Sequence, residues 1–172
     1  MMKILTNNKK YFFPLGLVLI LSFSRLIPHP PNFTPVIAVA VMSSYFFSNK
    51  YMGLAAMFVS MILADSVIGF YSGMFYVYFS LVLIILIFSN LAKYINFKNL
   101  FLYSLSGSVI FFIITNAGVW FSGLLYEKSF QGLLECYYMA IPFFKNTVLS
   151  TLIFSYCAFI ASSIRKTKLK II

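Results

Sequence analysis

Eight polar or charged side chains interrupt long apolar stretches of this sequence: Arg25, His29, Asn32, Asp65, Asn116, Trp120, Lys145 and Asn146. A charged side chain placed in hydrocarbon costs on the order of 3 kcal/mol. These side chains are therefore expected to face a partner, water or a ligand rather than lipid. Their types suit the binding of a small solute, because they combine charge, directional hydrogen bonds and a flat ring for stacking.

The acid of this set, Asp65, needs a cation, and the sequence offers two candidates for it. We predict that Asp65 pairs with Arg25 or with Lys145, and that the pair forms a charged floor of the site. The alternative is that such a pair only holds helices together. The shared depth of the polar residues in several spans favours a site, since joining two helices does not require it.

The remaining side chains of the set would supply hydrogen bonds and stacking. Asn116 and Trp120 are four residues apart, so they share one helical face and place an amide beside a ring. We predict that Asn116, Asn146 and His29 hydrogen-bond the solute and that Trp120 stacks on it. Taken by itself, Trp120 also fits the aromatic belt at a membrane surface.

Motifs for catalysis and for metal binding are absent from the sequence. His29, Cys136 and Cys157 have no second ligand at a short spacing, and no nucleophile elbow or phosphate-binding glycine loop occurs. We therefore predict no metal, no cofactor and no enzymatic activity. An alternative is a membrane enzyme in which His29 and Asp65 act as acid and base on one substrate.

The elements that position these residues follow from composition. Of the 172 residues, 62% are hydrophobic and 9% are charged, which leaves too little polar surface for a water-soluble globule. We predict one all-α integral membrane domain over residues 1–172. Apolar runs place about six transmembrane helices at 11–27, 35–48, 52–70, 75–92, 100–122 and 139–164.

The net charge of +10 comes from one side of these spans. The outer half holds three cations and three acids, so ten inner cations carry the excess: Lys3, Lys9, Lys10, Lys50, Lys93, Lys98, Arg165, Lys166, Lys168 and Lys170. By the positive-inside rule, both termini are cytoplasmic in a bacterial inner membrane, and the basic tails need no nucleic-acid partner. Residues 11–24 also fit a cleavable signal peptide, whose removal would leave five spans.

Two outer connections have distinctive sequences. Residues 27–35 contain four prolines, which predicts a stiff, extended loop that lies against the bundle or lines a wet cavity and closes over the solute. Thr34 is expected to cap the helix that starts at Pro35. Residues 123–138 are amphiphilic and predict an interfacial half-helix or a simple connector. Small residues at the start of the third and fifth spans predict close helix packing: Gly53, Ala55, Ala56, Ser104, Ser106, Gly107 and Ser108.

Several motifs together resemble an uncharacterised family of small bacterial membrane proteins. They are Pro28-His29-Pro30-Pro31-Asn32-Phe33-Thr34-Pro35, Thr115-Asn116-Ala117-Gly118-Val119-Trp120 and Pro142-Phe143-Phe144-Lys145-Asn146-Thr147. In size, span number and outward-facing site, the chain is more distantly similar to the substrate-binding S components of energy-coupling-factor transporters. That similarity implies uptake of a small polar or aromatic solute, together with a transmembrane coupling subunit and an ATPase. A membrane scaffold or assembly protein without a solute is the alternative from another class.

Overall fold

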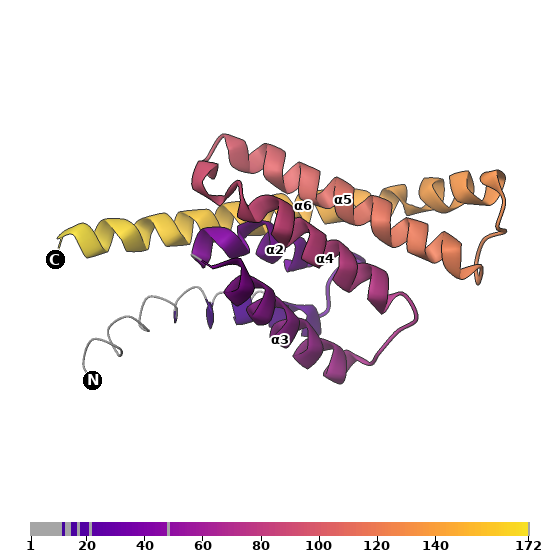
Figure 1. The fold of residues 1–172 in the computed structure, drawn as a ribbon, viewed down its shortest axis with the longest axis horizontal. Coiled ribbons are helices and arrows are strands. Elements are labelled where there is room, and N and C mark those ends of the chain that lie inside the picture. Colours follow the sequence, from indigo (N-terminus) through magenta and orange to yellow (C-terminus); the bar gives the residue numbers. More distant parts are fainter. Residues whose placement is uncertain (1–11, 13–14, 17, 21, 48, 172) are drawn as a thin grey trace.

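The computed structural model describes residues 12, 15–16, 18–20, 22–47 and 49–171, with side chains described as far as Ile164. These residues form helices and connections without a strand (Figure 1). After the short 3-10 helix η1 (Ser24–Leu26) come α2 (Val36–Phe46), α3 (Lys50–Ile68), α4 (Met74–Ser89), η2 (Ala92–Tyr94), α5 (Asn99–Ser122) and α6 (Phe130–Ile171). The all-α prediction is confirmed for this part of the chain.

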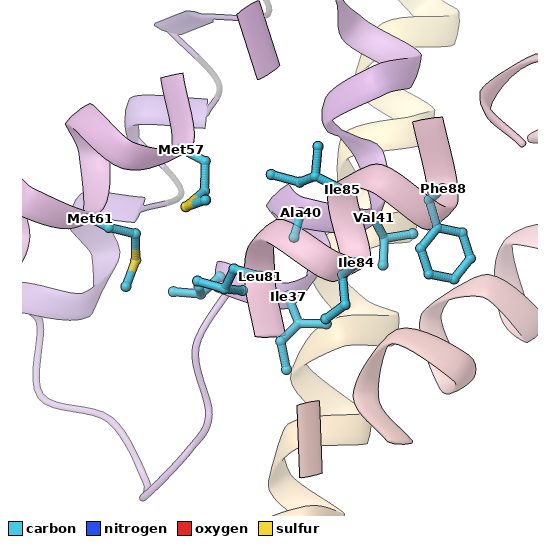
Figure 2. Close-up of a cluster of buried hydrophobic side chains, with 10 residues drawn as sticks. Ile37, Ala40, Val41, Met57, Met61, Leu81, Ile84, Ile85 and Phe88 are labelled. Carbon is cyan, nitrogen blue, oxygen red and sulfur yellow. The ribbon is translucent and has the colours of Figure 1, made fainter. Parts of the chain in front are cut away.

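The core is organised around α2, which contacts α3, α4, α5 and α6. Every residue from Val36 to Ser43 is buried, as expected for a helix that is apolar on all sides. Figure 2 shows one buried cluster in which Ile37 and Val41 of α2 lie near Leu81 and Ile84 of α4. Helix α2 is therefore the central helix of the described bundle.

Small residues allow two of these close approaches. A Cβ atom added at Gly107 of α5 would lie 2.7 Å from Cγ2 of Val41, and one added at Gly53 of α3 would lie 3.1 Å from Oγ of Ser43. The packing role predicted for these two glycines is confirmed. Ala55 and Ser106 are exposed, so these two small residues do not serve helix contact in the described fold.

The boundaries of the last helix differ from the sequence prediction. Helix α6 runs without interruption from Phe130 to Ile171 and contains Pro142. The predicted start at residue 139 and the separate interfacial half-helix over 123–138 are therefore wrong. Residues 130–138 instead pack on α5, where the Tyr137 hydroxyl donates to the Ile113 carbonyl at 2.7 Å. A proline inside an apolar helix is tolerated when neighbouring helices compensate for the missing hydrogen bond.

Three described helices are long and apolar enough to cross a membrane: Lys50–Ile68, Asn99–Ser122 and Phe130–Ile164. Helices α2 and α4 are apolar but shorter, with 11 and 16 residues. At 1.5 Å per residue, α2 is about 16 Å long, which is half of the hydrocarbon thickness. These lengths indicate a membrane protein. The predicted first span, 11–27, lies partly outside the described residues. The N-terminal lysines, Lys3, Lys9 and Lys10, lie wholly outside them.

The basic connections of the described chain lie at one end of the bundle. Figure 1 places the α2–α3 connection, the α4–α5 connection and the C-terminal part of α6 at the same end. Lys50, Lys93 and Lys98 belong to this end, and the Tyr156 hydroxyl of α6 donates to the Phe97 carbonyl there at 2.9 Å. Three of the ten cations predicted to share one side, Lys50, Lys93 and Lys98, therefore lie at the same end of the described bundle.

The proline loop, residues 27–35, joins η1 to α2. Asn32 has a φ of 60°, and the Phe33 amide donates to the Pro30 carbonyl at 2.9 Å, which makes a tight turn. The Asn146 side chain of α6 donates to the Pro31 carbonyl at 2.9 Å and so ties the loop to the bundle. The Thr34 cap is wrong: Pro35 occupies the cap position of α2, and no side chain caps that helix.

Candidate functional site

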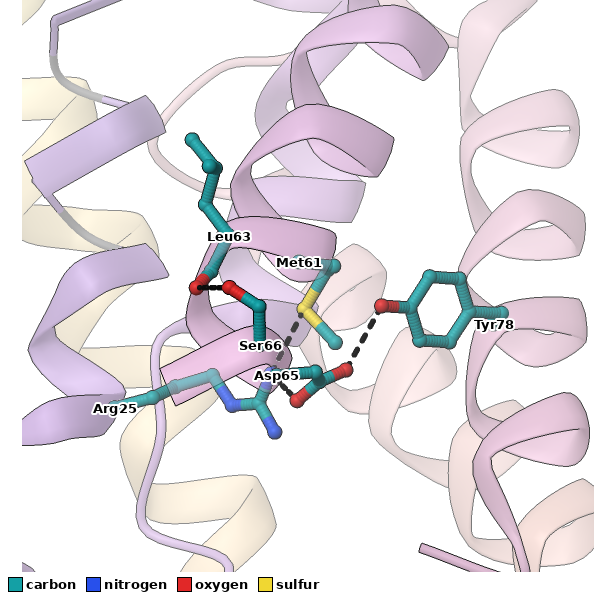
Figure 3. Close-up of polar contacts among 6 residues, drawn as sticks. All are labelled: Arg25, Met61, Leu63, Asp65, Ser66 and Tyr78. Atoms are coloured by element: carbon teal, nitrogen blue, oxygen red, sulfur yellow. Dashed lines mark hydrogen bonds and ion pairs between the residues drawn. The ribbon is translucent and has the colours of Figure 1, made fainter. Parts of the chain in front are cut away.

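A buried ion pair lies beneath the proline loop. Nη1 of Arg25 lies 2.8 Å from Oδ1 of Asp65 and 3.3 Å from the sulfur of Met61 (Figure 3). The Asp65 side chain is 0% exposed and that of Arg25 is 13% exposed. Of the two cations considered for Asp65, the structure therefore selects Arg25. Lys145 is exposed on α6 and does not reach this acid.

The second oxygen of the carboxylate has a partner that the sequence analysis missed. The Tyr78 hydroxyl of α4 donates to Oδ2 of Asp65 at 2.8 Å (Figure 3). Tyr78 lies in the second turn of α4, and Asp65 lies one turn before the end of α3. A tyrosine at matching depth in the neighbouring span was the available signal, but the many aromatic residues of this chain obscured it.

The contact between Arg25 and Oδ1 is ionic rather than a well-aligned hydrogen bond, because Oδ1 accepts none of good geometry. The pair is thus held by charge on one oxygen and by the Tyr78 hydroxyl on the other. Breaking a buried pair by removing one partner typically costs about 3–5 kcal/mol, whereas replacing both partners by apolar groups is often neutral. The stability of this region therefore depends on keeping the two charges together.

A cavity of about 360 Å³ adjoins the ion pair and reaches the proline loop. Its polar lining includes three residues of the predicted set, Arg25, His29 and Asn32, together with Thr34 and Tyr71. The apolar part of the wall consists of Val36, Met61, Ile68, Val77 and Phe111. This volume lies in the range of roughly 300–1,000 Å³ that is usual for small-molecule sites.

A second cavity of about 200 Å³ shares three lining residues with the first: Asn32, Val77 and Phe111. Asn116 and Thr115 of α5 also line it, opposite residues contributed by α6. The Asn116 amide group donates to the Phe112 carbonyl of its own helix at 2.8 Å, which leaves its oxygen as an acceptor. The two cavities are therefore neighbours and are separated by a small number of side chains.

The other predicted residues lie apart from these cavities or support the loop. The Trp120 indole donates to the Glu127 carbonyl at 3.0 Å and so anchors the α5–α6 connection. Nδ1 of His29 lies 2.9 Å from the Pro30 carbonyl, which makes Nδ1 the protonated nitrogen. Asn146 holds the loop through its backbone. Among the described residues, Trp120, Lys145 and Asn146 are not in the lining of either cavity.

Tyr71, in the connection between α3 and α4, lines the larger cavity. Burial, and then the charge of Asp65, raise the pKa of Tyr71 above its usual value, while the charge of Arg25 and a side-chain hydrogen bond from Arg25 lower it. The net direction is upward, so the Tyr71 hydroxyl stays protonated at neutral pH and can donate a hydrogen bond. The described residues hold no group of three His, Cys, Asp or Glu that could bind a metal ion.

A family described as one of unknown function, DUF6580, matches residues 5–172. The chain belongs to DUF6580. Neither a curated protein nor a solved structure matches this DUF6580 chain. The prediction that the chain belongs to an uncharacterised family is therefore confirmed. Any conclusion about what this DUF6580 site binds has to come from its geometry.

The arrangement in this DUF6580 chain combines a fixed cation, hydroxyl donors and an apolar wall around one hollow. The buried Asp65 carboxylate, which accepts a hydrogen bond from the Tyr78 hydroxyl, holds the Arg25 side chain from one side. The other side of Arg25 belongs to the cavity wall. Such a preorganised polar group in a largely apolar hollow can bind and orient a small solute.

Proposed function

We propose that this chain is a membrane-embedded binding subunit that captures a small solute, with a polar end and an apolar or aromatic body, in the cavity beneath the proline loop. One observation supports this most strongly: Arg25, which is ion-paired with the buried Asp65, lines a cavity of about 360 Å³. Arg25 supplies charge, and Asn32, Thr34 and Tyr71 supply hydrogen bonds. The solute enters from the outer face, where the loop lies.

The role of the proline loop in this proposal rests on how it is held. Asn146 fixes the loop backbone, and the Phe33 ring meets Phe154 of α6 edge-on at 6.1 Å. These two contacts to α6 hold the loop in the closed position over the cavity. The loop would then open to admit the solute and close above it.

Uptake is the second part of the proposal, by analogy with the S components of energy-coupling-factor transporters. The sequence contains no phosphate-binding glycine loop, and in this analogy a separate coupling subunit and ATPase drive inward movement of the solute. Accumulation of a labelled solute by cells that carry the chain, compared with cells that lack it, tests this part. Equal accumulation in the two kinds of cell at saturating expression would refute the uptake proposal and would leave the binding proposal standing.

A thermal-shift screen of the detergent-purified protein against vitamins, nucleobases, amino acids and carboxylic acids tests the binding proposal. Val77 lines both cavities, so Val77→Phe should fill the hollow and abolish the shift caused by a stabilising solute. Val109→Phe is the matched control, because Val109 is exposed on α5 and the same volume is added outside the cavities. A scaffold protein would show no solute-dependent shift in either variant or in the parent.

A further inference from the structure

Arg25 has hydrogen-bonding capacity beyond its contact with Asp65. Nη1 makes both close contacts, to Oδ1 of Asp65 at 2.8 Å and to the sulfur of Met61 at 3.3 Å. A side-chain hydrogen bond also joins Arg25 to Tyr71. A guanidinium carries five N–H donors in a planar fork, which matches the two oxygens of a carboxylate.

The acids of the chain do not offer a complementary site for a cation in this cavity. The sequence contains three acids in total. Asp65 is 0% exposed, with Arg25 at one oxygen and the Tyr78 hydroxyl at the other. Glu127 and Glu135 are exposed, in the α5–α6 connection and on α6. A solute in the cavity therefore meets the guanidinium before it meets a carboxylate.

Neutral donors and apolar surface complete the wall. Thr34 and Tyr71 line the same cavity as Arg25, and the Tyr71 hydroxyl can donate. Val77 and Phe111 line this cavity and the smaller one next to it, so they form an apolar passage between the two. A solute with a charged end at Arg25 would place its apolar body along this passage.

We propose that the solute is a small monocarboxylate with an apolar body, and that its carboxylate accepts hydrogen bonds from the guanidinium donors of Arg25 that Asp65, Met61 and Tyr71 do not occupy. This inference rests on the proposed function and specifies the solute class of the same site. Asp65 then acts as a positioning residue that holds the guanidinium in place. Charge-assisted hydrogen bonds of this kind are the strong ones, so the carboxylate should dominate affinity.

Two matched series of probes test the inference on the full-length protein in detergent. The first is 3-phenylpropanoate, 3-phenylpropanamide and 3-phenylpropylamine; the second is hexanoate, hexanamide and hexylamine. Within each series the apolar body is constant and the polar end changes from anion to neutral to cation. We expect the carboxylate to raise the Tm and to bind at least about tenfold more tightly than its amide, because the amide loses the charge assistance.

A charge-neutral double variant tests the assignment to Arg25. Arg25→Gln with Asp65→Asn leaves no unpaired buried charge and keeps an acceptor for Tyr78, so the fold should persist. The carboxylate preference should fall to near unity. Arg25→Lys, which keeps the charge and loses the fork, should retain a weaker preference. Lys128→Gln is the control, since it removes an exposed cation of the outer connection and should leave the preference unchanged.

The outcomes separate this inference from the proposed function. Equal or tighter binding of the amides or amines would overturn the carboxylate assignment while binding in the cavity stands. A carboxylate preference that survives in the double variant would also overturn it. If the double variant fails to fold, Arg25→Lys tests the assignment instead. A carboxylate preference as strong as in the parent protein would then show that the guanidinium of Arg25 does not bind the carboxylate. Absence of any shift in both series overturns the inference, and the broader screen then decides the proposed function separately.

Discussion

Removing the cation of the buried pair is the most informative perturbation of stability. Arg25→Met keeps a long, unbranched side chain and leaves the Asp65 carboxylate, 0% exposed, without its counterion. Loss of one partner of a buried pair costs about 3–5 kcal/mol. We expect a value near the lower end, because the Tyr78 hydroxyl still donates to one oxygen of the carboxylate.

The double variant that removes both charges gives a second change in the free energy of unfolding, which can be compared with that of Arg25→Met. Arg25→Met with Asp65→Leu replaces the pair by apolar side chains of similar volume, a change that is often neutral. The Tyr78 hydroxyl then loses its acceptor, which costs about 1–3 kcal/mol if the group stays buried. We therefore expect the double variant to be more stable than Arg25→Met by about 1 kcal/mol, although it carries one more substitution.

Equilibrium unfolding of the purified protein by SDS in mixed micelles gives the free energies for this cycle. Asp65→Leu alone completes the cycle and yields the interaction energy between the two sites. The reasoning would be refuted by Arg25→Met with parental stability, or by single-variant losses that simply add in the double variant. Either result would mean that the carboxylate is solvated or paired in another way.

Three further outcomes follow from individual contacts. Tyr78→Phe should destabilise the protein by about 1.5–3 kcal/mol, since it removes a hydrogen bond to a charged acceptor; a change within error in SDS unfolding would contradict that bond. Gly118→Ala places a Cβ 2.2 Å from the ring of Tyr76 and should cost about 1–3 kcal/mol, whereas Gly73→Ala, with nothing within 4 Å, should be nearly silent in the same assay. Asn146→Ala should free the proline loop and raise its amide hydrogen exchange, and unchanged protection would refute the tether.

The helical class and the cores of the spans were predictable because their signal is local. An apolar run such as Val36–Met42 indicates a buried helix from composition alone, whatever the rest of the chain does. Helix ends depend on weaker and more distant contacts. The start of α6 at Phe130 is an example, since the amphiphilic residues 123–138 indicate a connector or a separate half-helix, whereas residues 130–138 belong to the last helix and pack on α5.

The candidate site was only partly predictable, for a related reason. The cost of burying a charge indicates that Asp65 has a partner, but the choice between Arg25 and Lys145 depends on how helices rotate about their axes. The rotation of α5 about its axis likewise could not be predicted, and it decides which of Asn116 and Trp120 lines a cavity. They share a face by spacing, yet Asn116 lines a cavity and the Trp120 indole donates to the Glu127 carbonyl. Tyr78 was missed because a tyrosine in an aromatic-rich span has an ordinary structural role.

Solute protection of an introduced cysteine tests the central claim most directly. Thr34→Cys places a thiol in the wall of the larger cavity, in a background with Cys136→Ala and Cys157→Ala, and Gln131→Cys on exposed α6 is the control. We expect a stabilising solute from the screen, at saturation, to slow labelling of the first thiol by a membrane-impermeant maleimide severalfold and to leave the second unchanged. Equal labelling rates at position 34 with and without the solute would contradict binding beneath the proline loop.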